Sequence, residues 1–389
     1  MRSRGGFHRQ PTAGRHVICI TTRCEPGTYF LESEDFMAQR LTAESQHPQD
    51  RSRNILAAAA TGVADFIART GGRPEAVFER IGIDAACLGQ TRSALDLADY
   101  VAMMEDAAQE TGNDNFGLWF GQRYQPRMLG LIGEIALSAP TLGSAIEHLA
   151  LWFPWHQQAT ETRLTRQDGF LRLEYRILDG SIVDRRQDAE LTMGMFANVF
   201  RACLPSGWAP EMVVFEHARP ALWRDHEAAF DADVGWSQGT NALMFRDHGL
   251  DRAMPQADLS RLQRLTTDLA GVAGSCGTPA FLDLVRGEIR RRLAVGPLHL
   301  EDIADALSTT PWTLQRRLAE FGATFSDLVE ATRLDLARHY LRQAHLQLGD
   351  IAFLLGYSEA SAFSRAFSRW AGCGPRQWRQ LSRPVLSRS

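Results

Sequence analysis

The chain of 389 residues contains no lysine, since all 42 of its basic residues are arginine. This absence excludes enzymes that depend on a lysine, such as nucleotide hydrolases with a phosphate-binding P-loop and enzymes that form a Schiff base. The sequence also lacks the run of about 18 apolar residues that predicts a membrane-spanning helix. We therefore expect a cytoplasmic protein that does not contact membranes.

Cysteine is scarce and scattered. The six cysteines are Cys19, Cys24, Cys87, Cys203, Cys276 and Cys373. They form no C-x-x-C pair, and no Cys/His cluster has the spacing of a zinc site. The sequence also shows no catalytic triad and no phosphate-binding loop. We predict free thiols, no metal, no cofactor and no enzymatic activity.

One pattern occurs twice near the C-terminus, in Leu300–Gly322 and again in Leu348–Gly372. Asp302-Ile303-Ala304 recurs 48 positions later as Asp350-Ile351-Ala352. Leu314, Arg316, Leu318 and Phe321 recur 49 positions later as Phe363, Arg365, Phe367 and Trp370. Each copy is typical of a helix-turn-helix unit. Two such units allow one chain to read two stretches of DNA.

The first copy has the local signals of two short helices. Thr310 can cap the second helix with its hydroxyl, and Pro311 suits the first helical position. The residues expected to face inward are Ile303, Ala304, Leu307, Leu314, Leu318 and Phe321. Trp312, Gln315 and Arg316 point elsewhere, and Gln and Arg suit bidentate contacts with base edges. In the second copy we expect Ser358 as the cap, with Phe363, Phe367 and Trp370 inward.

Residues 326–342 predict a helix that links the two copies. Its apolar residues lie on more than one side, which favours packing against both units. A helix of this length spans ~25 Å. The two reading helices are then expected to lie roughly one DNA turn, ~34 Å, apart.

The C-terminal part resembles the AraC/XylS-type transcription regulators. The resemblance covers Phe281 to Leu381 and rests on Phe363-Ser364-Arg365-Ala366-Phe367 and on Gly372 to Arg379, with Arg333, Ala337 and Leu341 in the linking helix. It implies double-stranded DNA and RNA polymerase as partners. It places the base-facing residues at Trp312, Gln315 and Arg316, and at Glu359, Ala360, Ser361, Ala362 and Arg365. Arg379 is a candidate phosphate contact. The chain departs from the family at Gly374, where Ser or Thr is usual.

Asn54 to about Pro255 predicts a separate domain of mixed type, α/β or α+β. The candidate helices are Ile55–Ala68, Pro74–Ile81, Leu97–Glu110, Phe116–Gln122, Leu142–Phe153 and Asp188–Leu204. The candidate strands are Glu161–Arg166, Leu171–Ile177, Met212–Glu216 and Ala242–Phe245. Phe215-Glu216-His217, Asp233 to Trp236 and Asn241 to Phe245 resemble the arabinose-binding-like sensor domain that precedes this DNA-binding module in one subgroup. The resemblance implies a small organic effector as a further partner.

Two clusters in this domain allow alternative interpretations. Trp152, Phe153, Trp155 and His156 either line an effector pocket or fill the domain core. His226 and Asp231 have the H-x4-D spacing of some acyltransferases, but no supporting motif accompanies them. We expect His226 instead on the surface of a helix that contains Trp223 and Phe230. A further alternative makes the whole domain a homodimerisation scaffold without a ligand.

These observations divide the chain into five segments. We predict an extension without a fold of its own at 1–50, with Met37 as an alternative start, and a sensing or oligomerisation domain at 51–255. A linker at 256–279, a tandem helix-turn-helix domain at 280–382 and a tail at 383–389 follow. From Ser275 onward 15 arginines face 11 acidic residues, a net charge of +4, so the rest of the chain carries −8. This basic bias is modest, and on its own it is more typical of a solvated surface than of a DNA-binding face.

Overall fold

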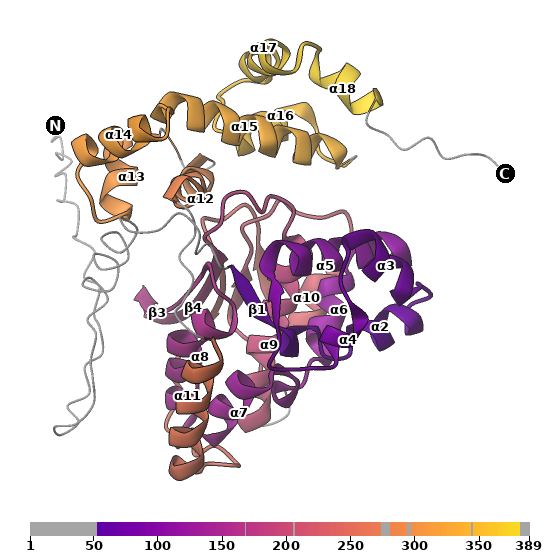
Figure 1. The fold of residues 1–389 in the computed structure, drawn as a ribbon, viewed down its shortest axis with the longest axis vertical. Coiled ribbons are helices and arrows are strands. Elements are labelled where there is room, and N and C mark those ends of the chain that lie inside the picture. Colours follow the sequence, from indigo (N-terminus) through magenta and orange to yellow (C-terminus); the bar gives the residue numbers. More distant parts are fainter. Residues whose placement is uncertain are drawn as a thin grey trace, which may run out of the picture.

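The computed structural model describes residues 53–381 apart from 168, 205–206, 274–280, 294–295, 297 and 344. Residues 53–273 form an α/β domain, and residues 281–381 form a helical domain (Figure 1). The helical domain lies along one side of the α/β domain, with its first helix between the two (Figure 1). The predicted extension at 1–50 and the tail at 383–389 lie outside the described residues. No helix among the residues described is both long and apolar enough to cross a membrane.

The α/β domain begins with short elements that lead into longer helices. Its first half contains β1 (Asn54–Leu56), η1 (Ala57–Ala60), α2 (Val63–Arg69), α3 (Pro74–Ile81), α4 (Ala85–Leu88), β2 (Ala94–Asp96), α5 (Leu97–Thr111), α6 (Phe116–Arg123), η2 (Pro126–Leu129), α7 (Leu131–Ser138) and α8 (Leu142–His156). Its second half contains β3 (Thr160–Gln167), β4 (Phe170–Ile177), α9 (Arg186–Cys203), β5 (Met212–Val214), α10 (Arg224–Phe230), β6 (Asp233–Gly235), β7 (Asn241–Phe245) and α11 (Leu259–Ala273).

A five-stranded sheet in the order β3-β4-β7-β5-β6 forms the centre of this domain. Its strands pair antiparallel except β5 and β6, which are parallel. In β4 every second side chain is buried, as the alternating sequence predicts. Leu173 lies opposite Leu164 on one neighbouring strand and Leu243 on the other. The strand pairing therefore brings these leucines side by side.

Helix α9 is buried along almost its whole length and crosses α6 at close range. Glycines make this approach possible. A Cβ added to Gly117 would lie 2.1 Å from the carbonyl oxygen of Gln187, and one added to Gly121 would lie 2.7 Å from that of Leu191. On the α9 side, a Cβ on Gly194 would lie 2.7 Å from the backbone of Gly121. Larger residues at these positions would push the two helices apart.

Several predictions for this domain need correction. The helix expected at Ile55–Ala68 is a strand, a 3-10 turn and then α2, because residues 54–56 pair with β2. The segment 256–279, expected as a linker, contains the 15-residue helix α11. Leu262 and Leu269 of α11 are buried in the core of the α/β domain. This helix therefore belongs to the packed domain.

The helical domain has seven helices within its described residues. They are α12 (Phe281–Leu293), α13 (Leu300–Ala306), α14 (Pro311–Glu320), α15 (Phe325–Arg342), α16 (Leu348–Leu354), α17 (Ala360–Ala371) and α18 (Pro375–Leu381). One hydrophobic cluster runs through all of them and also takes in Leu178 and Ala218 of the α/β domain. The close fit of α12 explains this shared core: a Cβ on Gly287 would lie 2.3 Å from the carbonyl oxygen of Leu178.

Candidate nucleic-acid interface

The first helix-turn-helix unit consists of α13 and α14. Thr310 caps α14 as predicted, because its hydroxyl accepts a hydrogen bond from the Thr313 N–H. The turn before it places Ser308 at φ 51°, in the left-handed region. In the second unit, formed by α16 and α17, the position 48 residues later is Gly356 with φ 76°. The two copies thus share the same turn geometry, once with a serine and once with a glycine.

The predicted reading residues of the first unit lie together on the outside of α14. Trp312 is 67% exposed, and Gln315 and Arg316 are also exposed. The guanidinium of Arg316 lies 5.1 Å from the centroid of the Trp312 ring and 3.7 Å from the Glu320 carboxylate. The first helix of the unit, α13, exposes Glu301, Asp302 and Asp305. Because phosphates repel these carboxylates, α14 is the surface of this unit that suits DNA.

The second unit differs in two ways from the prediction. The cap of α17 is Glu359 and not Ser358, because the helix begins one residue later. The carboxylate of Glu359 accepts a hydrogen bond from the Ser361 hydroxyl at 2.9 Å, so the two predicted reading residues pair with each other. Ala360 is half-buried, whereas Arg365 is exposed and is the longest predicted reading side chain on this helix.

The linking helix α15 holds the second unit in place. The two carboxylate oxygens of Glu330 accept hydrogen bonds from Arg369 at 2.6 Å and from the Trp370 indole N–H at 3.1 Å. Arg333 donates to the carbonyl oxygen of Leu355 at the end of α16. Sequence reasoning missed Glu330, although it lies three residues from Arg333, on the same side of the predicted helix.

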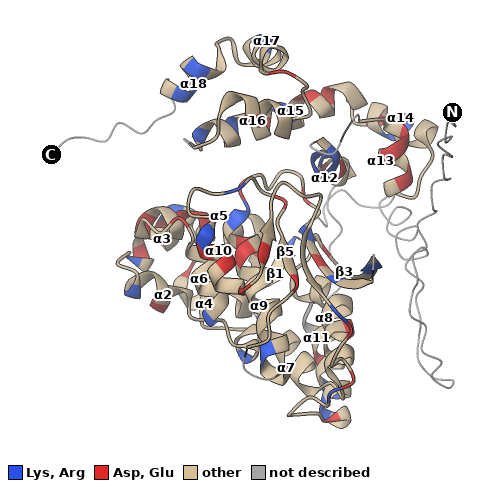
Figure 2. Ribbon diagram, turned by 180° about the vertical axis from the view of Figure 1, so that it is seen from behind, with Lys and Arg blue, Asp and Glu red and all other residues tan. Residues whose placement is uncertain are grey.

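The last helix, α18, carries Arg376 and Arg379 and is strongly basic (Figure 2). Arg379 has a structural role that was not anticipated. Its guanidinium donates to the carbonyl oxygens of Leu341 and Leu346, at 3.1 and 2.9 Å, where α15 ends. Its contact with a phosphate stays a prediction.

Comparisons with known proteins agree with this geometry. Residues 303–381 match a helix-turn-helix domain, and residues 71–254 match the arabinose-binding domain of AraC transcription regulators. The chain is 31% identical to the HTH-type transcriptional regulator VirS of Mycobacterium tuberculosis, over 82% of this chain and 94% of that protein. It is 27% identical to the ornithine utilization regulator of Pseudomonas aeruginosa, over 84% and 96% respectively.

The chain belongs to the AraC family of transcription regulators. The predicted α/β domain followed by an all-α domain with two helix-turn-helix units is thereby confirmed. As an AraC-family member, the protein binds DNA and regulates transcription. The alternative of an acyltransferase is wrong.

The structure gives the physical reason why His226 is not a catalytic base. The prediction that it lies on a helix surface was wrong, because His226 is fully buried. Its Nε2 lies 2.8 Å from the carboxylate of Glu190 on α9. Burial would raise the pKa of Glu190, but Arg186 and His226 outweigh burial and hold it at about 2. His226 thus belongs to a buried polar cluster, and Asp231 ends α10 in the left-handed conformation.

The aromatic cluster of the α/β domain in this AraC-family protein divides into inner and outer parts. Phe153 and His156 are fully buried, and the Phe153 ring packs edge-on against Tyr175 and Phe196. Burial lowers the pKa of His156 to about 3. Trp152 and Trp155 are half-buried, with ring centroids 5.8 Å apart. Within this cluster only the two tryptophans expose surface to a ligand from solution, and the ligand contact stays a prediction.

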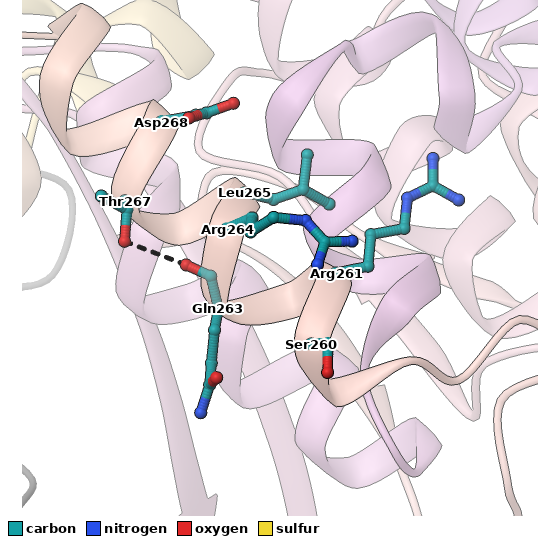
Figure 3. A pocket seen from close by; sticks show the side chains of 7 residues that line it. All are labelled: Ser260, Arg261, Gln263, Arg264, Leu265, Thr267 and Asp268. Carbon is teal, nitrogen blue, oxygen red and sulfur yellow. Dashed lines mark hydrogen bonds between the residues drawn. The ribbon is translucent and has the colours of Figure 1, made fainter.

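Two concave regions lie elsewhere on this domain. The larger, of about 670 Å³, runs along α11, and Figure 3 shows its described lining. That lining is Ser260, Arg261, Gln263, Arg264, Leu265, Thr267 and Asp268. All of these residues come from one helix, so the described residues form one wall and not an enclosed site. The smaller region, of about 420 Å³, lies mainly between α5 and the loop 181–184, with Ile81 of α3 and Arg53 also in its lining.

That loop is also one of the places where the helical domain touches the α/β domain. Arg342 of α15 donates to Asp184 at 2.7 Å, and His339 pairs with the same carboxylate. Arg290 of α12 donates to the carbonyl oxygens of Ile182 and Val183, at 3.1 and 3.0 Å. These contacts link residues more than 100 positions apart, so no local sequence pattern predicts them.

Proposed function

We propose that this AraC-family protein reads DNA sequence mainly through α14 and that a small organic effector in the α/β domain controls its binding. The exposed group of Trp312, Gln315 and Arg316 carries the first part of the proposal. Arginine and glutamine can each make two hydrogen bonds to a base edge, and the indole adds an apolar contact for a thymine methyl group. The second unit offers Arg365 beside small or paired side chains, which suits positioning on the backbone.

The contact between the domains supports effector control. Asp184 and the backbone of residues 182–183 bind α12 and α15, the helices against which both reading units pack. If two arrangements of this contact differ in DNA affinity, a ligand that prefers one of them changes the DNA affinity of the protein. DNA then changes the ligand affinity by the same factor.

The test is a selection of DNA sites from random duplexes with the full chain. The selected site and a scrambled duplex are then titrated at several salt concentrations, since the affinity of proteins for any DNA depends on salt. Enrichment of one sequence motif supports the proposal. Equal affinity for the selected and scrambled duplexes at every salt concentration would contradict it.

The alternative function for the α/β domain is a dimerisation scaffold without a ligand. The tryptophans of α8 distinguish the two, because an effector near Trp152 and Trp155 should quench their fluorescence. Light scattering of the full chain measures the homodimer directly. A dimer with no fluorescence change and no thermal shift across a metabolite set favours the scaffold. Contact with RNA polymerase is a further proposal, and co-purification with the enzyme on promoter DNA tests it.

A further inference from the structure

The smaller pocket lies between the sensor helix α5 and the loop that contacts the helical domain. Its volume is about 420 Å³. Helix α5 contributes Ala98, Val101, Ala102, Glu105, Asp106 and Gln109, and the loop 181–184 contributes the facing wall. The lining therefore combines apolar side chains with polar ones, and two of its carboxylates come from α5. A concave site that pairs apolar surface with a few placed polar groups is the usual form of a small-molecule site.

Glu105 differs from the other charged residues around this pocket. Asp106 pairs with Arg80 at 2.7 Å, and Arg53 is held by Asp96 and Asp179. Glu105 accepts a hydrogen bond from the backbone N–H of Gln187 at 2.8 Å and forms no ion pair within the part of the chain that the structure describes. Burial raises its pKa to about 7, even though Arg186 and the Gln187 N–H act to lower it. A half-buried carboxylate that forms no ion pair can accept a charge-assisted hydrogen bond from a cationic ligand.

We propose that this pocket binds a small primary amine with a short apolar body, whose ammonium group donates to Glu105. The inference rests on the proposed effector control and names its ligand class. An ammonium has three donors and makes a charge-assisted hydrogen bond with a carboxylate. The body of the ligand packs against Val101 and Ile182. An anion is disfavoured because Glu105, Asp106 and Asp184 all line the pocket.

The position of the pocket couples it to the helical domain. Residues 182–184 form its wall on one side and bind Arg290, His339 and Arg342 on the other. An amine that fills the pocket therefore touches the same short loop that holds α12 and α15. Any factor by which the amine changes DNA affinity is also the factor by which DNA changes amine affinity.

Isothermal titration of the full chain with three probes of the same shape tests the proposal. The probes are isopentylamine, isopentanol and isovalerate, which are cationic, neutral and anionic. We expect the amine to bind most tightly. Glu105→Gln should weaken the amine roughly tenfold or more and leave the alcohol unchanged. Glu79→Gln, on the exposed surface of α3, is the matched control and should change neither.

A second variant keeps the test valid if Glu105→Gln unfolds the protein. Ala102 is exposed and lines the pocket, so Ala102→Leu fills space without entering the core. It should abolish amine binding while Glu105 is intact.

Three results would overturn the inference. They are tighter binding of isovalerate than of the amine, full amine affinity in both pocket variants, and no binding of isopentylamine or of its straight-chain homologues. If the wild-type chain still selects a DNA motif, such a result removes this inference alone. If it selects none, the proposed DNA reading fails independently of the amine result.

Discussion

Replacement of Arg316 by alanine separates base reading from a purely structural role. In the structure the side chain has two intramolecular partners, the Trp312 ring at 5.1 Å and the Glu320 carboxylate at 3.7 Å. Both side chains of the ion pair are more than half exposed, at 58% and 60%. An exposed pair at this spacing contributes about 0.3–0.5 kcal/mol, and an exposed cation–π contact about 0.5–1 kcal/mol. The variant should therefore lose little more than ~1 kcal/mol of stability.

The expected loss in DNA binding is larger. A bidentate contact between arginine and a base contributes about 1–3 kcal/mol of discrimination, which is roughly 5- to 150-fold in affinity. We expect this loss at the selected site, little loss on a scrambled duplex and an almost unchanged dependence on salt. Arg365→Ala, 49 positions later in the second unit, is the matched comparison. It should weaken both duplexes more evenly and reduce the salt slope by about 1.

The assay is a fluorescence anisotropy titration on both duplexes at several salt concentrations, with melting curves of the free proteins. If Arg316→Ala weakens the selected and scrambled duplexes equally, Arg316 is not a base reader. If Arg316→Ala loses only a few tenths of a kcal/mol of stability and keeps its DNA specificity, the ion pair with Glu320 is the whole role of Arg316.

Three further substitutions test the fold. Ser308→Gly should raise the melting temperature of the helical domain, because φ 51° costs a non-glycine residue about 1 kcal/mol; a lower melting temperature would contradict this. Gly121→Val should destabilise the α/β domain by more than ~1–3 kcal/mol in a denaturant titration, since its Cβ would lie 2.7 Å from the Leu191 carbonyl oxygen. Burial raises the pKa of Asp188 from 3.8 to about 7 despite its hydrogen bond from Tyr175, so the folded state holds this proton more tightly. The free energy of unfolding of wild type relative to Asp188→Asn should therefore fall as the pH rises from 3.8 to about 7. If this difference in free energy stays constant over that pH range, Asp188 is ionised in the folded state throughout it.

The sequence predicted the helical domain well because its signals are local. The cap at Thr310 and the inward positions Leu314 and Leu318 depend on neighbours within one or two turns. Phe321 is an exception. It was expected inward, but it is 51% exposed and stacks on Phe281 at the edge of the domain.

The features that sequence reasoning missed depend on distant partners. His226 is buried because Glu190, 36 positions away, accepts its hydrogen bond. Asp184 contacts Arg342 across 158 positions, and neither residue stands out in the sequence. Helix α11 was missed for a different reason. Its glycine-rich end suggested a linker, although the buried Leu262 and Leu269 share one helical face and could have revealed it.

The attachment of both reading units to a single helix has a consequence for promoters. Helix α15 has 18 residues and spans ~27 Å, with the second unit fixed to it through Glu330 and Arg333. Each base pair inserted between two half-sites turns one of them by roughly 35° about the DNA axis and moves it by ~3.4 Å. A rigid reader cannot follow such a rotation. A promoter recognised by this protein should therefore tolerate base changes under α17 more readily than the gain or loss of a single spacer base pair.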